Sequence, residues 1–147
     1  MAKIKKEKSV KAVNDVYKNA HIAMQSISDL LPQVKDAELK KELKTEYSSY
    51  EKFIEGLTEF MKSSKIEPKD INFLQKAFMW SSIKIKTLFN RSRTKIAEMM
   101  ILGTVMGITE LTAMHNEGKT LQKDVAEKVD ELLNLEEDFE KRLKTFL

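Results

Sequence analysis

The sequence predicts an all-α protein that folds as a helical bundle. Glycine and proline are rare, with four and two in 147 residues, and strong helix formers fill the stretches between them. Apolar residues recur at steps of three and four along three long segments, which is the period of a helix face packed on a core. A chain of this length can bury a substantial core, so residues 1–147 are expected to form a single helical-bundle domain.

The first helix is expected from about Ser9 to Leu31. Its apolar seam follows steps of four, three, four, three and four, and consists of Val13, Tyr17, Ala20, Met24, Ile27 and Leu31. Pro32 disfavours helical geometry at the residue before it, so the helix should end near Leu31. Residues 1–8 are rich in lysine and are expected to form a flexible basic tail.

The second helix is expected from Ala37 to Ser63, with Asp36 as its N-cap. Its seam keeps the same period and carries a carboxylate in the middle: Leu39, Leu43, Glu46, Tyr50, Phe53, Leu57 and Phe60. After a short loop that contains Pro68, a third helix is expected from Ile71 to Phe89.

A fourth helix is expected over Ile96 to Met114. Asn90 to Ser92 could separate it from the third helix or lie inside one bent helix, and the sequence favours the break. Its ten residues from Met99 to Ile108 carry no charge in a chain that is 33% charged, so we expect this helix to be central and buried on nearly every side. Gly103 and Gly107 share one face, which predicts either close approach of another helix or a small cavity beside a ligand.

The last helix is expected to continue to the C-terminus, with Gly118 just after the preceding helix and Thr120 as its N-cap. Its seam again holds a carboxylate at mid-length: Val125, Val129, Leu132, Glu136, Phe139, Leu143 and Phe146. The two seam carboxylates, Glu46 and Glu136, are therefore expected in the interior, where a carboxylate is costly unless it is paired or bound to a metal.

Short connections make successive helices alternate in direction. If the third helix lies outside as a crossover, the other four run up, down, down and up, which is the ferritin-like arrangement. An up-down bundle with the third helix in the core is the alternative. The chain also resembles small, poorly characterised bacterial proteins of the ferritin-like superfamily, through NAHIAMQSISDLLPQV, EYSSYEKF and IAEMMILGTVMGITEL. The resemblance implies a four-helix bundle with an additional crossover helix.

Helix directions also bring four ionisable residues to one level, as candidate metal ligands: His21, Glu46, Glu98 and Glu136. Carboxylates with imidazole suit iron or manganese. The alternative is a polar layer without metal, in which Glu46 bonds a tyrosine, His21 pairs with a carboxylate and Glu136 lies toward solvent.

The resemblance also implies two Glu-x-x-His motifs, but the histidine positions after Glu46 and Glu136 hold Ser49 and Phe139. Ferroxidase activity is therefore not expected, and no residue is assigned a catalytic role. Glu110 is expected at the rim of the bundle and His115 at a helix end.

Composition narrows the function classes. The chain has no cysteine, which excludes disulfides, thiol nucleophiles and iron–sulfur clusters, and it shows no phosphate-binding loop. We expect a structural, stress-related or partner-binding protein. The alternatives are a carboxylate-rich metal site, or binding of nucleic acid or an anionic surface through two basic groups. These groups are Lys3, Lys5, Lys6, Lys8 and Lys11, and Lys84, Lys86, Arg91, Arg93 and Lys95.

The apolar segment also predicts how the chain is located and assembled. Ten uncharged residues span roughly 15 Å, short of the ~20 apolar residues that a bilayer requires, so no membrane span is expected. No signal-peptide pattern follows the basic start, which predicts a cytoplasmic protein. Apolarity all round Met99 to Ile108 is compatible with a homodimer that shares part of this helix or the helix that contains Trp80.

Overall fold

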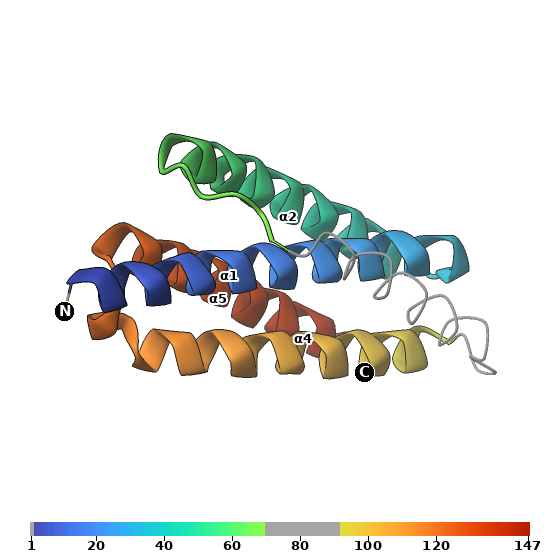
Figure 1. The fold of residues 1–147 in the computed structure, drawn as a ribbon. Helices are drawn as coiled ribbons and strands as arrows, with labels where there is room; N and C mark the ends of the chain where they lie inside the picture. Colours follow the sequence, from blue (N-terminus) through green and yellow to red (C-terminus); the bar gives the residue numbers. More distant parts are fainter. Residues whose placement is uncertain (1, 70–91) are drawn as a thin grey trace.

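The computed structural model describes residues 2–69 and 92–147, and these residues form a helical bundle (Figure 1). Its helices are α1 (Ala2–Leu30), α2 (Ala37–Ser63), α4 (Arg93–Asn116) and α5 (Lys123–Lys144), with short 3-10 turns at Leu31–Gln33 and Gly118–Thr120. No strand occurs in these two ranges. The predicted all-α bundle is confirmed, and the helix expected over residues 71–89 lies outside the described residues.

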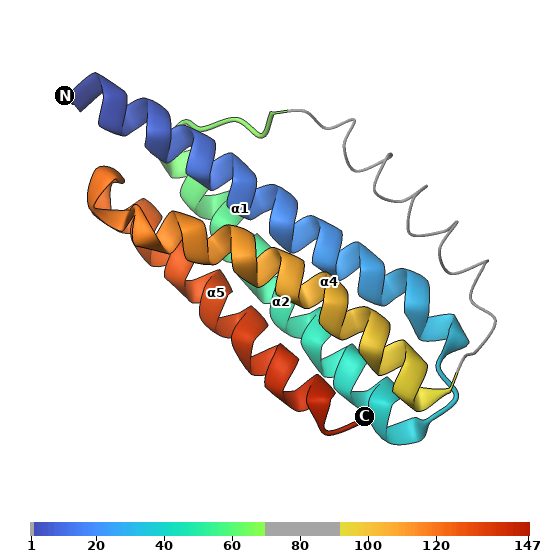
Figure 2. The ribbon, with the colours of Figure 1, turned by 90° about the horizontal axis from the view of Figure 1, so that it is seen from below.

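Two pairs of adjacent helices build the bundle. Helix α1 packs mainly on α2, and α4 packs mainly on α5. The pairs meet where α1 contacts both α5 and α4, and α2 contacts α5. In Figures 1 and 2, α1 and α5 run in one direction while α2 and α4 run in the opposite direction. Each helix therefore occupies one corner of the bundle, with one side toward the core.

Two of the described helices begin at a residue whose side chain caps the first turn. The Asp36 side chain accepts a hydrogen bond from the Leu39 amide at 2.9 Å, as predicted. Extended backbone at Ser92, whose hydroxyl accepts from the Lys95 amide at 3.3 Å, starts α4 at Arg93.

The predicted cap of the last helix is wrong. The Thr120 hydroxyl donates to the Glu117 carbonyl at 2.7 Å instead, because Thr120 belongs to the preceding 3-10 turn. Helix α5 begins three residues later, with Gln122 at the N-cap position and without a side-chain cap, and it ends at Lys144 rather than at the terminus.

The start of the chain extends the first helix. Helix α1 begins at Ala2, so the residues expected to form a basic tail make its first turns, and their side chains are exposed. Lys11 pairs with Asp15 one turn later at 2.8 Å, which gives this basic face one local ion pair.

The core forms where the seams predicted it. The innermost residues of the first, second and last helices are fully buried, including Val13, Ala20, Ile27, Leu39, Leu43, Leu57, Val125, Val129, Leu132 and Leu143. Burying such side chains contributes roughly 1.5–3 kcal/mol each to folding, so these seams account for the association of the helices.

The position predicted for the fourth helix is wrong. Helix α4 buries one face, while Leu102 is 69% exposed, Met106 71% and Val105 40%. The physical reason is that α4 occupies a corner of the bundle and contacts α5 and α1 on one side only. An uncharged run tells how apolar a helix is, and it does not tell how many neighbours cover it.

Helix α4 also passes a length and composition test for a membrane span. The test is weak for one helix, because a core helix of a soluble protein passes it too. The expectations of no membrane span and of a cytoplasmic location stay predictions.

Candidate functional site

Two carboxylates lie in the middle of the bundle, as the seams predicted. Glu46 of α2 and Glu136 of α5 are each 1% exposed. They have different partners, and one oxygen of each, Oε1, has no hydrogen-bond partner in the described structure. A buried polar atom without a partner costs about 1–3 kcal/mol, so both side chains require an explanation.

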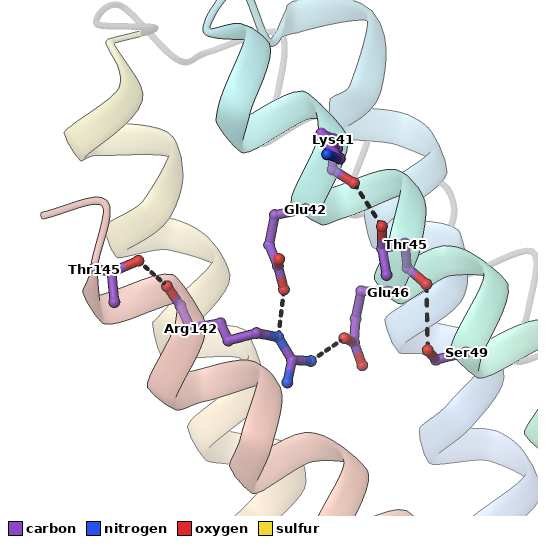
Figure 3. A network of polar contacts seen from close by, with 7 residues as sticks. All are labelled: Lys41, Glu42, Thr45, Glu46, Ser49, Arg142 and Thr145. Atoms are coloured by element: carbon purple, nitrogen blue, oxygen red, sulfur yellow. Dashed lines mark hydrogen bonds and ion pairs between the residues drawn. The ribbon is translucent and has the colours of Figure 1, made fainter.

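Glu46 is held by Arg142 of α5. The guanidinium donates through Nη2 to Glu46 Oε2 at 2.5 Å and through Nε to Glu42 Oε1 at 2.5 Å, bridging two turns of α2 (Figure 3). Burial raises the pKa of Glu46 to about 7 although Arg142 opposes the shift. The ion pair joins α2 to α5 at the edge of the core, where the Arg142 side chain is 46% exposed.

Glu136 is held by Tyr50 of α2. The tyrosine hydroxyl donates to Glu136 Oε2 at 3.0 Å, and its ring makes an edge contact with Phe139. Burial raises the pKa of Glu136 to about 8, and the negative charges of Glu110 and Glu46 act in the same direction. At neutral pH Glu136 is therefore mainly a neutral carboxylic acid.

The free oxygen of Glu136 faces α4 at Gly107. A Cβ atom at this position would clash with Glu136 Oε1 and would lie 3.3 Å from the Asn19 side chain. Asn19 of α1 donates through Nδ2 to the Gly107 carbonyl at 3.2 Å and to Glu110 Oε2 at 3.5 Å. Gly107 is thus required because a carboxyl group and an amide occupy the space of a side chain.

Beside this group lies a cavity of about 380 Å³ between α1 and α4, closed below by α2 and α5. Most of its wall is apolar. The described residues that line it are Asn19, Ile22, Ala23, Ser26, Leu30, Tyr50, Met99, Met100, Leu102, Gly103, Thr104, Met106, Gly107, Glu110, Glu136 and Phe139. None of them is lysine, arginine or histidine, and Gly103 faces open space.

The four predicted metal ligands do not converge. Glu98 lies exposed and pairs with Lys95 at 3.0 Å. His21 is half-buried and contacts the Tyr17 ring at 4.3 Å between centroids, and burial lowers its pKa. Within residues 2–69 and 92–147, no group of three or more histidine, aspartate or glutamate side chains could hold a metal ion.

The donor chemistry also argues against a metal between the two buried carboxylates. Arg142 already places a positive charge on Glu46, and Glu136 is mainly protonated at neutral pH. A metal would have to displace that cation and that proton. The described residues therefore do not fit an iron or manganese centre, and no chemistry is derived from one.

The alternative predicted partners are wrong as well. Glu46 bonds an arginine rather than a tyrosine, and Glu136 is buried instead of lying toward solvent. Among residues 2–69 and 92–147, the buried Nε2 of His21 has no hydrogen-bond partner. The sequence pattern does not reveal Arg142, because its contact with Glu46 joins two helices that are not neighbours along the chain. Helices α2 and α5 are antiparallel, and Tyr50 of α2 contacts Glu136 of α5. Glu46, one turn before Tyr50, therefore lies beside a later turn of α5, which carries Arg142.

The other polar residues named in the sequence analysis lie at separate places in the structure. Glu110 lines the cavity, and burial raises its pKa. His115 lies at the end of α4, with its Nδ1 2.6 Å from the carboxylate of Asp130 on α5. Of the second basic group, residues 84, 86 and 91 lie outside the described residues, while Arg93 lies 4.0 Å from Asp36 and Lys95 pairs on its own helix.

Comparison of the chain with protein-family models, curated proteins and solved structures found no match. A function therefore has to be argued from the cavity and the buried carboxyl group.

Proposed function

We propose that this chain is a ferritin-like bundle without ferroxidase activity that acts by binding, and that the cavity between α1 and α4 is its ligand site. The helix directions and the missing Glu-x-x-His motifs support the first part. One observation carries the second: an apolar cavity of about 380 Å³ has a buried carboxyl group with an unpartnered oxygen in its wall.

The size of the cavity favours a ligand over a packing defect. Small-molecule sites typically measure roughly 300–1,000 Å³, and this partly open cavity lies within that range. Small residues leave this space open, because Ala23 of α1 and Gly103 of α4 line it and a Cβ atom at Gly103 would meet nothing within 4 Å. A ligand would restore the missing contacts.

The position of Glu136 supports the same reading. An unpartnered buried oxygen and an unfilled apolar cavity are both unfavourable, and here they occur at one place. A molecule with an apolar body and one polar group would offset both costs at once. Apolar walls with few polar groups are the usual make-up of ligand pockets.

A neutral fluorescent probe, N-phenyl-1-naphthylamine, tests the proposal. We expect its fluorescence to rise with the wild-type chain and the melting temperature to rise with probe concentration by mass action. Gly103→Leu should fill the cavity and reduce the affinity at least tenfold. Gly56→Leu is the matched control, because Gly56 is also a helical glycine with open space around it but does not line the cavity.

Equal affinity in Gly103→Leu and Gly56→Leu would refute the cavity as the site. Absence of any probe binding to the wild type, together with unchanged thermal stability, would refute the proposed function itself.

The predicted homodimer is a second candidate, and one observation favours it. Leu102, Val105 and Met106 form an exposed apolar strip on α4, and soluble monomers rarely leave contiguous apolar surface uncovered. Two copies packed through this strip would cover it symmetrically. Iron or manganese binding has no such support, and metal analysis of protein purified without chelator would test it directly.

A further inference from the structure

We propose that the ligand of this cavity is an apolar amine, whose ammonium group pairs with the Glu136 carboxylate while its hydrocarbon body lies between α1 and α4. This inference rests on the proposed function and names the ligand class of the same site.

The ionisable groups that line the cavity favour a cationic ligand over an anionic one. Its described lining contains two carboxyl groups, Glu110 and Glu136, and no basic side chain. Where Glu136 is ionised, a fatty acid or other anion would be repelled by both acids, and the described lining offers it no counter-charge. An ammonium group meets an acceptor that lacks a partner, Glu136 Oε1.

The geometry orients that acceptor. Tyr50 holds Glu136 Oε2 at 3.0 Å, so the other oxygen is turned toward Gly107, which lines the cavity. Both amide contacts of Asn19 Nδ2 go to the Gly107 carbonyl and to Glu110, so this amide does not satisfy Oε1. The acceptor is fixed in place, without a hydrogen-bond partner, and it packs against Gly107 at the wall of the cavity.

The mouth of the cavity suits the rest of the molecule. Leu102 and Met106 of α4 and Ile22 of α1 line the cavity and are 69%, 71% and 40% exposed. An alkyl or aryl group that leaves the ammonium would contact these side chains and cover them. Met106 adds an unbranched side chain that adapts to different shapes.

Binding is coupled to one proton. In the free protein Glu136 carries a proton, and an alkylammonium ion pairs only with its carboxylate, so the step is carboxylic acid plus alkylammonium giving the ion pair plus a released proton. The neutral Tyr50 of α2 acts on Glu136 through its hydrogen bond, and the charges of Glu46 of α2 and Glu110 of α4 act on it directly. Asp15, Lys11 and Lys18 of α1 act on Glu110. The nearest acids, Glu46 and Glu110, both favour a cation.

Three eight-carbon probes test the inference by titration calorimetry: n-octylamine, 1-octanol and octanoate. At pH 8 we expect octylamine to bind at least tenfold tighter than octanol, and octanoate to bind weakest. Octylamine affinity should rise by up to tenfold per pH unit from pH 6 toward pH 8, because the carboxyl group must deprotonate. Titrations in phosphate and in Tris should report release of close to one proton at pH 6.5.

Glu136→Gln should lose the preference for the amine and keep octanol binding, while Glu127→Gln, an exposed acid on the same helix, should behave as the wild type. Octanol or octanoate binding as tightly as octylamine, or binding without proton release, would overturn the amine while the proposed ligand site stands. Failure of all three probes to bind would overturn both. The comparison of probes and the proton count use the wild type, so they stand even if the variant does not fold.

Discussion

The buried acid Glu136 makes the stability of this bundle depend on pH in a direction that can be tested. Its pKa lies near 8 in the folded chain, against an ordinary value of 4.5. Between these values the folded state binds more protons than the unfolded state, so stability falls as pH rises. The favourable contribution is complete below about pH 4.5 and is lost as pH rises through 8.

The size of the effect follows from that interval. Each pKa unit corresponds to about 1.36 kcal/mol, so the change from 4.5 to about 8 represents on the order of 5 kcal/mol. Glu136→Gln removes the titration and keeps a carbonyl oxygen for the Tyr50 hydroxyl. Between pH 5 and pH 9 the wild type should therefore lose roughly 3–5 kcal/mol more than the variant.

Urea unfolding followed by circular dichroism at pH 5, 7 and 9 measures this difference, since the midpoint reports stability where the slope is unchanged. Near pH 5 the two proteins should have similar stability, and at pH 9 the variant should be the more stable one. Glu127→Gln is the control for a charge change on an exposed part of α5. Parallel pH profiles for the wild type and Glu136→Gln would refute the account of a buried neutral acid.

Three further predictions concern other parts of the bundle. Gly107→Ala should destabilise the fold by roughly 1–3 kcal/mol because its Cβ meets the facing carboxyl group, whereas Gly103→Ala has open space and should stabilise it by about 0.5–1 kcal/mol in thermal unfolding. Arg142→Gln should cost about 1–3 kcal/mol in urea unfolding by leaving Glu46 without its cation, and Glu46→Gln in the same chain should recover part of that loss; no recovery would contradict the pair. Light scattering should give a dimer mass for the wild type and a monomer mass for Leu102→Glu, and an unchanged mass would exclude the α4 strip as the interface.

The sequence was sufficient for the presence of the four described helices and for the depth of the two acids. A seam of steps of three and four fixes which side of a helix faces the core, and Glu46 and Glu136 lie on such seams, so their burial follows from the same periodicity as that of Leu43 and Val129. The cap at Asp36 was equally predictable, because it depends only on neighbours along the chain.

The partners of those acids depended on information that periodicity does not contain. Whether Glu136 meets Tyr50 or a metal is decided by the register between α2 and α5, which are far apart in the sequence, and by side-chain direction. The Arg142 side chain, which is 46% exposed, reaches Glu46 from the last turns of α5, where the sequence pattern resembles any solvated helix end. The position of a residue on an apolar seam predicts that its side chain is buried, whereas the register between two helices decides which groups that side chain contacts.

The contacts around Glu136 suit the binding of a ligand better than they suit the stability of the fold. A polar layer that served only to fix helix register would satisfy both oxygens of the acid, and Asn19 also lies against Gly107. Its amide is instead committed to Gly107 and Glu110, and the glycine keeps the space beside Oε1 free of a side chain. An apolar residue at position 136 would remove a buried titratable group at little cost in packing. Retaining the acid at the wall of a cavity therefore fits selection for a bound cation, in keeping with the general exchange of stability for function at binding sites.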